Sequence, residues 1–271
     1  MIDTEIGCTF EFVTSRPTHA VVMVEPHFAE SGRIIETRFE LDPHDPSSVY
    51  LDHFGNSCRR VNLAAGPVTM TYAAVMSTPD DADPVEFGAV EVAPADLPDE
   101  ALMFVLPSRF CQSDLMADFA FAEFGQVQPG WSRVQAISDW VNGALKFQYG
   151  SSSPSVSAMD VLGSRTGVCR DFAHLAIALC RSLNIPARYV FGYLPDIGVP
   201  DPGTPMDFCA WMEVYLGDGW HTFDPRNNER RIGRTVIGRG RDAADVAMVT
   251  SFGEVQLLGM TVVAAQRSPL S

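Results

Sequence analysis

The sequence predicts an α+β fold in which an N-terminal β-sandwich precedes a core of helices and antiparallel strands. Short β-prone runs separated by turn residues fill the first part of the chain, and this pattern is typical of a sandwich. A long apolar helix is predicted over residues 168–183, where apolar side chains recur at spacings of four, three and four. Strand candidates follow that helix. A helix followed by an antiparallel meander belongs to the α+β class.

The composition is that of an ordinary globular protein with an acidic excess, a formal net charge of -15 over 271 residues. This charge argues against nucleic acid and anionic membranes as partners, and no apolar run reaches the length that spans a bilayer. The first five residues lack the basic segment of a secretory signal. The six cysteines include no CxxC pair, which favours reduced thiols in a cytoplasmic protein over a disulfide framework.

Residues 1–95 are expected to form the sandwich domain. Residues 77–100 are rich in proline, acidic residues and alanine, which indicates a loop and a linker. We therefore expect a domain boundary near residue 95, with a core domain over residues 96–271. The strand candidates of the sandwich, separated by turn-rich stretches, cover residues 9–13, 20–24, 33–40 and 68–75.

The second part begins with two predicted helices before the central one. Ser113 is a candidate cap for the first, which would end at Gly125. The second covers residues 131–146, where apolar residues recur on one face. Later strands are predicted over residues 187–193, 209–216, 220–225, 246–250 and 255–265, the second and third joined as a hairpin.

Cys169 lies in the first turn of the central helix. The unpaired N–H groups and the positive end of the dipole favour an anion at a helix N-terminus, and a thiolate is such an anion. We therefore interpret Cys169 as a reactive thiol. Cys180, further along the same helix, is interpreted as a small buried core residue.

Four motifs in the core, with a fifth near the N-terminus, resemble a known family. Together they resemble the transglutaminase-like superfamily of papain-type cysteine enzymes, with the β-sandwich that precedes this core in bacterial members. The resemblance implies a papain/transglutaminase-like core, in which the helix carrying the cysteine packs on an antiparallel sheet. The motifs are residues 167–171, 185–193, 210–215, 220–225 and 52–56.

The resemblance implies a nucleophile and an orienting acid. By motif match Cys169 is the nucleophile that attacks an amide carbonyl, and Asp224 is the acid that orients a histidine. The family places that histidine immediately before Ala-Trp-x-Glu-Val, where this chain has Cys209. The general base is therefore missing from its expected place, and a thiol replaces it poorly near neutral pH.

Two histidines near these motifs are interpreted as structural. His221 lies three residues before Asp224 on the same predicted strand, so the two side chains are expected on opposite faces. His174 lies five residues after Cys169, well round the circumference of the helix.

Three classes of function remain open. The first is a cysteine peptidase, amidase or acyl transferase that acts on peptide or protein amides without cofactor or metal, with reduced or altered activity. The second is a catalytically inactive module that binds a peptide in the same cleft. The third is a redox or zinc site formed by Cys169, Cys209 and Asp224, since two thiolates and a carboxylate suit zinc.

Overall fold

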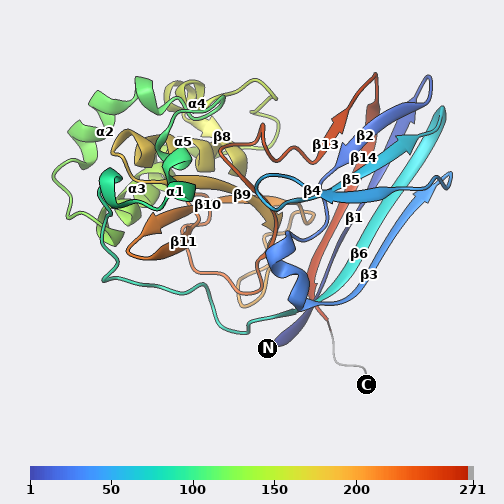
Figure 1. Cartoon of the computed structure of the whole chain (residues 1–271), viewed down its shortest axis with the longest axis horizontal. Helices are drawn as coiled ribbons and strands as arrows, with labels where there is room; N and C mark the ends of the chain where they lie inside the picture. The colour runs from blue at the N-terminus through green and yellow to red at the C-terminus, as the bar shows by residue number, and fades with distance from the viewer. Residues whose placement is uncertain (268–271) are drawn as a thin grey trace.

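The N-terminal part forms two four-stranded antiparallel sheets in the computed structural model, which describes residues 1–267 (Figure 1). Along β1 the side chains alternate between buried and exposed, which is the pattern of a strand with one face on a core. One sheet has the order β14-β1-β6-β3 and the other β13-β2-β5-β4. The strands are β1 (Ile2–Thr14), β2 (Thr18–Val22), β3 (Ile34–Asp42), β4 (Ser48–Leu51), β5 (Ser57–Leu63), β6 (Gly66–Thr78), β13 (Val249–Ser251) and β14 (Gln256–Gln266).

The core has a third antiparallel sheet, of order β11-β10-β9-β12, with the helix α5 packed against β9 and β10. Helix α5 is buried over nearly its whole circumference, as its apolar sequence predicts. A two-residue parallel pair, β7 with β8, leads the chain into α5. The elements are α1 (Asp99–Leu102), α2 (Ala117–Phe124), α3 (Trp131–Ala144), β7 (Lys146–Phe147), α4 (Ala158–Ser164), β8 (Thr166–Gly167), α5 (Cys169–Ser182), β9 (Ala187–Tyr193), β10 (Cys209–Leu216), β11 (Gly219–Phe223) and β12 (Thr235–Gly240).

These sheets and helices confirm the predicted α+β fold class. The central helix and the hairpin of β10 and β11 lie where the sequence predicts them. The helix predicted from Ser113 begins later, because residues Ser113–Leu115 form a 3-10 turn and α2 starts at Ala117. Strands β4, β5 and β12 are not among the predicted strands. In β12 the glycines are the reason. They lower the strand propensity, and at Gly238 a larger residue has little room, because an added Cβ would lie 2.7 Å from the Met23 sulfur and 2.9 Å from a Val246 methyl carbon.

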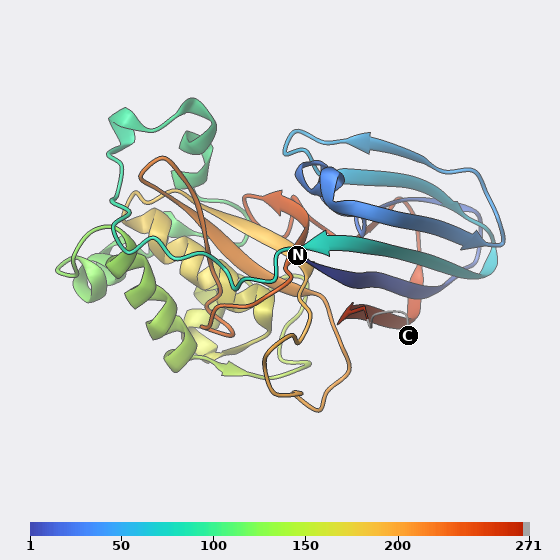
Figure 2. The same cartoon turned by 90° about the horizontal axis from the view of Figure 1, so that it is seen from below.

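The C-terminal strands return to the sandwich. Strand β14 pairs with β1 from Thr4 opposite Gln266 to Val13 opposite Gln256, and β13 pairs with β2. The boundary expected near residue 95 remains a prediction, but residues 249–266 lie in the sheets of the sandwich and not in the core sheet. Figure 2 shows β14 in red beside the blue N-terminal strands at the right of the view, with the core at the left. Within residues 1–267, no helix combines the length and apolar character needed to cross a bilayer.

Asn56, in one of the motifs that carry the resemblance, joins the sandwich to the core. Its side chain donates to the Arg239 carbonyl at 2.8 Å and accepts from the Arg239 N–H at 2.7 Å, like a further strand partner for β12. Arg239 in turn donates to Glu213 of β10, which also accepts from Arg188. The buried Glu213 carboxylate keeps a lowered pKa despite its burial, because these two arginines bind it.

Arg181 holds the C-terminal end of α5 to three neighbouring segments. Its side chain is 2% exposed and donates to the carbonyls of Ala187 at 2.7 Å, Leu106 at 3.1 Å and Arg241 at 2.6 Å. A planar guanidinium reaches three separated acceptors at once, which a compact ammonium cannot do.

We expect Arg181→Lys to lower the free energy of unfolding by about 2 kcal/mol, because at least one buried carbonyl loses its donor. Urea unfolding followed by tryptophan fluorescence measures the change. The matched control is Arg241→Lys, whose side chain is 46% exposed and paired with Asp245 on the surface. The control is expected to shift stability by less than about 0.5 kcal/mol, and equal effects of the two substitutions would contradict the prediction.

Candidate active site

Cys169 is the first residue of α5, and local hydrogen bonds fix the start of this helix. Val168, the N-cap residue, has extended backbone, and its N–H donates to the Asp171 carboxylate at 2.9 Å. The amide groups of the first turn have no carbonyl partner within the helix. The sulfur of Cys169 therefore lies at the positive end of the helix dipole, where a thiolate is stabilised.

Cys209 is the first residue of β10, and the structure brings it beside Cys169. Cys169 packs against the small apolar cluster that contains Cys209, Trp211 and Val190. Its sulfur is 4.0 Å from the carbonyl oxygen of Phe208. Gly192, opposite Cys209 on β9, leaves room for this cluster, because an added Cβ would lie 2.7 Å from the Trp211 ring.

The two neighbouring thiols have opposite acidities. The neighbouring Cys209 side chain is the main cause that lowers the pKa of Cys169 below its ordinary value of 9.0. The same contact, burial and the charge of Asp224 raise the pKa of Cys209 well above 9.0. Cys209 thus keeps its proton, and its sulfur donates to the Ala210 carbonyl oxygen at 3.7 Å. Burial raises the pKa of each of the other cysteines, Cys8, Cys58, Cys111 and Cys180.

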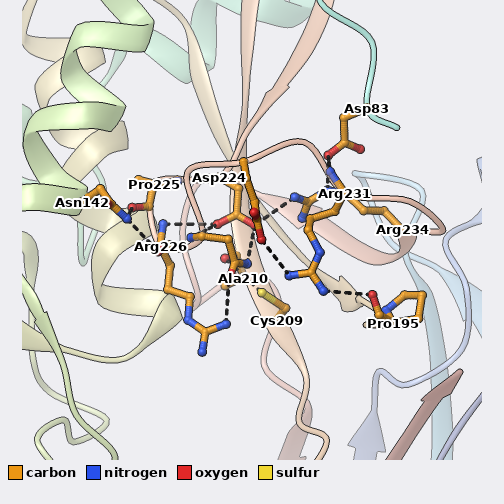
Figure 3. A network of polar contacts seen from close by, with 12 residues as sticks. Asp83, Asn142, Pro195, Cys209, Ala210, Asp224, Pro225, Arg226, Arg231 and Arg234 are labelled. Atoms are coloured by element: carbon orange, nitrogen blue, oxygen red, sulfur yellow. Dashed lines mark hydrogen bonds and ion pairs between the residues drawn. The ribbon is translucent and has the colours of Figure 1, made fainter. Parts of the chain in front are cut away.

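Asp224 follows β11, and its carboxylate is bound by a cation and an amide. One oxygen accepts from Arg234 at 2.9 Å and from the Asn227 side chain at 2.8 Å, and the other accepts from the Arg226 and Asn227 N–H groups (Figure 3). The Asp224 side chain is 2% exposed. The carboxylate that is expected to orient a histidine is therefore paired with Arg234.

Arg234 connects the site to the segment that the sequence presents as a linker. Its Nε donates to Asp83 at 2.8 Å, while its guanidinium lies 4.8 Å from the Trp211 ring centre. Asp83 also accepts from the Arg231 N–H, and its own N–H donates to the Arg231 carbonyl. At residue 83 this segment is therefore fixed against the site by buried charge and backbone hydrogen bonds.

His174 and His221 both lie in structural positions. His174 is buried between the rings of Phe110 and Tyr189, and its Nε2 accepts from the Ala243 N–H at 3.1 Å. Burial lowers the pKa of His174 well below 6.5. His221 lies against Trp131, with its Nε2 3.2 Å from the Leu216 carbonyl oxygen. In the part of the chain that the structure describes, neither has a hydrogen bond to Cys169.

Two cavities meet at the Cys169 side chain. The larger has a volume of about 740 Å³ and lies between the sandwich and the core. The smaller, of about 160 Å³, lies under the loop of residues 196–206. Val168, Cys169, Asp207, Phe208 and Cys209 line both. Among residues 1–267, no histidine lines either one.

The described residues contain no group of three or more His, Cys, Asp and Glu side chains placed to hold a metal ion. Both oxygens of Asp224 already accept hydrogen bonds, so this carboxylate has little capacity left for a cation. The zinc hypothesis gains no support from this arrangement.

The sequence identified Cys169, Cys209 and Asp224 but not Arg234 or Asn227. A signal for them is present, because four arginines follow Asp224 within ten residues of an otherwise acidic chain. They are Arg226, Arg230, Arg231 and Arg234. Such a cluster indicates fixed carboxylate partners. Which of these arginines binds Asp224 depends on the loop that returns from β11 to β12, and the sequence does not define that loop.

The comparisons with known proteins cover both parts of the chain. Residues 121–225 match the family model of the transglutaminase-like superfamily. A crystal structure of a proposed cysteine protease from Cytophaga hutchinsonii matches with a TM-score of 0.87 and 31% identity, over 100% of this chain and 92% of that one. An uncharacterised Mycobacterium leprae protein is 28% identical over 79% of this chain and 78% of its own length. An uncharacterised Mycobacterium tuberculosis protein is 33% identical over 49% of this chain and 46% of its own.

We expect Cys209→Ala to raise the pKa of Cys169, because the substitution removes the largest stabilising contact of the thiolate. A hydrogen bond to a charged group contributes about 1.5–3 kcal/mol, or one to two pKa units. Near neutral pH the thiolate fraction then falls, and alkylation of Cys169 slows by about tenfold or more. Iodoacetamide labelling across a pH series, read by peptide mass spectrometry, gives the midpoint.

Cys209→Ser is the matched control, because a hydroxyl keeps a donor at nearly the same place. Its labelling midpoint is expected to stay well below that of Cys209→Ala. Equal midpoints for the two variants would show that the helix N-terminus, and not residue 209, sets the acidity of Cys169.

Proposed function

The chain belongs to the transglutaminase-like superfamily, and from this premise we propose that it is a cysteine-dependent acyl-transfer enzyme with Cys169 as nucleophile. One observation carries the proposal. Cys169 is the half-buried thiol at the meeting point of two cavities, and its pKa is lowered while the pKa of every other cysteine is raised. A lowered pKa together with access to a cavity is typical of a catalytic thiol.

The first step is attack by the Cys169 thiolate on a carbonyl carbon. A carbon–sulfur bond forms, the bond to the leaving group breaks, and the leaving group departs with the electron pair. Water or an amine then attacks the thioester and releases the thiol, which yields hydrolysis or transfer. The N–H groups at the start of α5 are candidates to stabilise the oxyanion, because they have no helical partner.

The leaving group decides which acyl donors react well. An amine leaves from an amide only when it is protonated. Cys209, the neighbouring acid, has a pKa well above 9.0 and so is a weak proton donor near pH 7. Phenolates and thiolates leave without a proton. We infer that the site acts on ester or thioester donors in preference to peptide or protein amides, which remain slow substrates.

The ion pair of Asp224 and Arg234 takes a structural role in this proposal. Residue 209 is a cysteine, so Asp224 has no histidine to orient there. The Asp224 carboxylate is instead neutralised by the charge of Arg234. The pair holds the end of β11 against the start of β12. Cys209 acts as a positioning residue that lies beside the nucleophile and lowers its pKa, and it does not accept the proton of Cys169.

A catalytically inactive module that binds a peptide in the same cleft is the second candidate function. The observation that favours it is the size of the larger cavity, about 740 Å³, which is within the range of sites that hold a ligand. We also propose a cytoplasmic location, and the six free cysteines support it because free thiols persist in reducing compartments.

We expect a nitrophenyl ester to acylate the wild-type protein at Cys169 at least about 10²-fold faster than the corresponding nitroanilide, because the phenolate leaves unprotonated. Single-turnover release of nitrophenol, with the acyl-enzyme mass located by peptide mapping, measures this. Cys169→Ala is expected to abolish the acyl adduct. Equal rates for ester and anilide would contradict the proposed lack of a proton donor.

Cys209→His is expected to raise acylation by activated esters by about 10²-fold, the low end for a positioned acid–base group. The imidazole would lie beside Cys169, but Asp224 would orient it weakly because Arg234 already binds that carboxylate. The assay compares wild type, Cys209→His and Cys209→His with Cys169→Ala. A folded Cys209→His variant that acylates no faster than wild type would favour the binding module.

A further inference from the structure

The two cavities beside Cys169 differ in size and in lining. When a substrate carbonyl carbon lies at the Cys169 sulfur, its two substituents can extend into different cavities. Cys169 lies in the wall that they share. In any acyl-transfer step the acyl chain and the leaving group extend from the carbonyl carbon in different directions. The lining of each cavity therefore indicates what each half of the substrate is.

The larger cavity has a mainly apolar lining drawn from three separate parts of the chain. The sandwich supplies Phe10, Phe12 and Leu257, while the core supplies Phe191 and Phe208. The Phe10 and Phe208 rings stack across the junction, with their centroids 6.3 Å apart. The covering segment between β12 and β13 contributes a further set of mostly small apolar residues, namely Ala243, Ala244, Val246, Ala247 and Met248.

The smaller cavity has a mixed lining, in which charged side chains lie beside apolar ones such as Phe147, Leu194 and Met206. It is bounded by the carboxylates of Asp196 and Asp207 and by the guanidinium groups of Arg226 and Arg231. Burial raises the pKa of Asp207. A volume of about 160 Å³ accepts a short polar group and excludes a long chain. Asp196 and Arg231 already form an ion pair there at 2.6 Å, so Asp207 and Arg226 remain as the charged neighbours of a short polar group.

We propose that the larger cavity binds a medium-length aliphatic acyl chain, and that the polar leaving or acceptor group occupies the smaller one. This inference rests on the proposed function, because it names the acyl group that Cys169 accepts. Each methylene removed from water favours binding by about 0.8 kcal/mol, a factor of about four. The acyl selectivity of the protein is thus set by the junction of sandwich and core, and not by the core alone.

The covalent step balances with such a donor. The Cys169 sulfur forms a thioester with the acyl carbon, and the bond from that carbon to oxygen or sulfur breaks. The leaving group departs as an anion toward the smaller cavity, where Arg226 is part of the lining. Water then attacks the thioester, which releases the carboxylic acid and returns the thiol.

Nitrophenyl acetate, butyrate and octanoate test the chain-length dependence at one leaving group. We expect acylation of wild-type Cys169, as the second-order rate constant, to rise by at least about 10²-fold from acetate to octanoate. Leu257→Asp places a charge in the apolar lining at a side chain that is 48% exposed, so folding tolerates it. It is expected to lower the octanoate rate at least tenfold and to lower the ratio of the octanoate rate to the acetate rate by a similar factor.

Leu258→Asp is the matched control. Leu258 is the next residue of β14, is 58% exposed, and lies outside the described lining of the cavity. It is expected to leave both rates unchanged. Rates that do not depend on chain length, or equal losses for the two variants, would overturn the inference while the proposed nucleophile stands.

A second measurement does not require turnover. Octanamide is neutral and poorly reactive, and it is expected to slow iodoacetamide labelling of Cys169 at least about fivefold, whereas acetamide has no effect. Leu257→Asp is expected to abolish this protection and Leu258→Asp to retain it. Protection without acyl adducts from any ester would overturn the proposed function and support the cavity. The absence of protection by octanamide would overturn the cavity assignment.

Discussion

The ion pair between Asp224 and Arg234 is the interaction on which the site depends, because it joins three segments that are distant in sequence. Arg234 lies just before β12, Asp224 ends the hairpin of β10 and β11, and Asp83 belongs to the connection between sandwich and core. The pair is almost fully buried. Removal of either partner would leave the other charge buried and unpaired, which would strongly destabilise the fold. Two carboxylates around one guanidinium, with the Trp211 ring beside it, satisfy most of the charge.

The thiol pair is best understood as one ionising unit. Cys169 and Cys209 are neighbours and each shifts the pKa of the other, so the first proton lost belongs to the pair, and the second is held far more tightly. The helix N-terminus lies on the Cys169 side, and the charge of Asp224 lies on the Cys209 side. The helix N-terminus stabilises a thiolate at Cys169, and the Asp224 charge disfavours one at Cys209. The negative charge of the pair is therefore expected on Cys169.

Much of the fold could be predicted from sequence because the signals are local. The apolar period of α5, the cap position of Cys169 and the turn between β10 and β11 depend on residues close in the chain. Strand β12 and the return of β14 to β1 could not be predicted, because they depend on partners up to about 260 residues away. For the site, motif order identifies Cys169, Cys209 and Asp224. The choice of Arg234 as the partner of Asp224 is a matter of three-dimensional packing.

The return of the last strand to the first has a consequence for how the protein is made. As the chain leaves the ribosome, β1 can pair with β6, but its other edge stays open until β14 has been synthesised. An open edge is a template for pairing with another chain. The larger cavity is likewise unfinished until then, because Leu257 of β14 closes part of its wall. Formation of a competent binding surface is therefore a late event of biosynthesis, and the interval before it is when the nascent chain most needs protection from association.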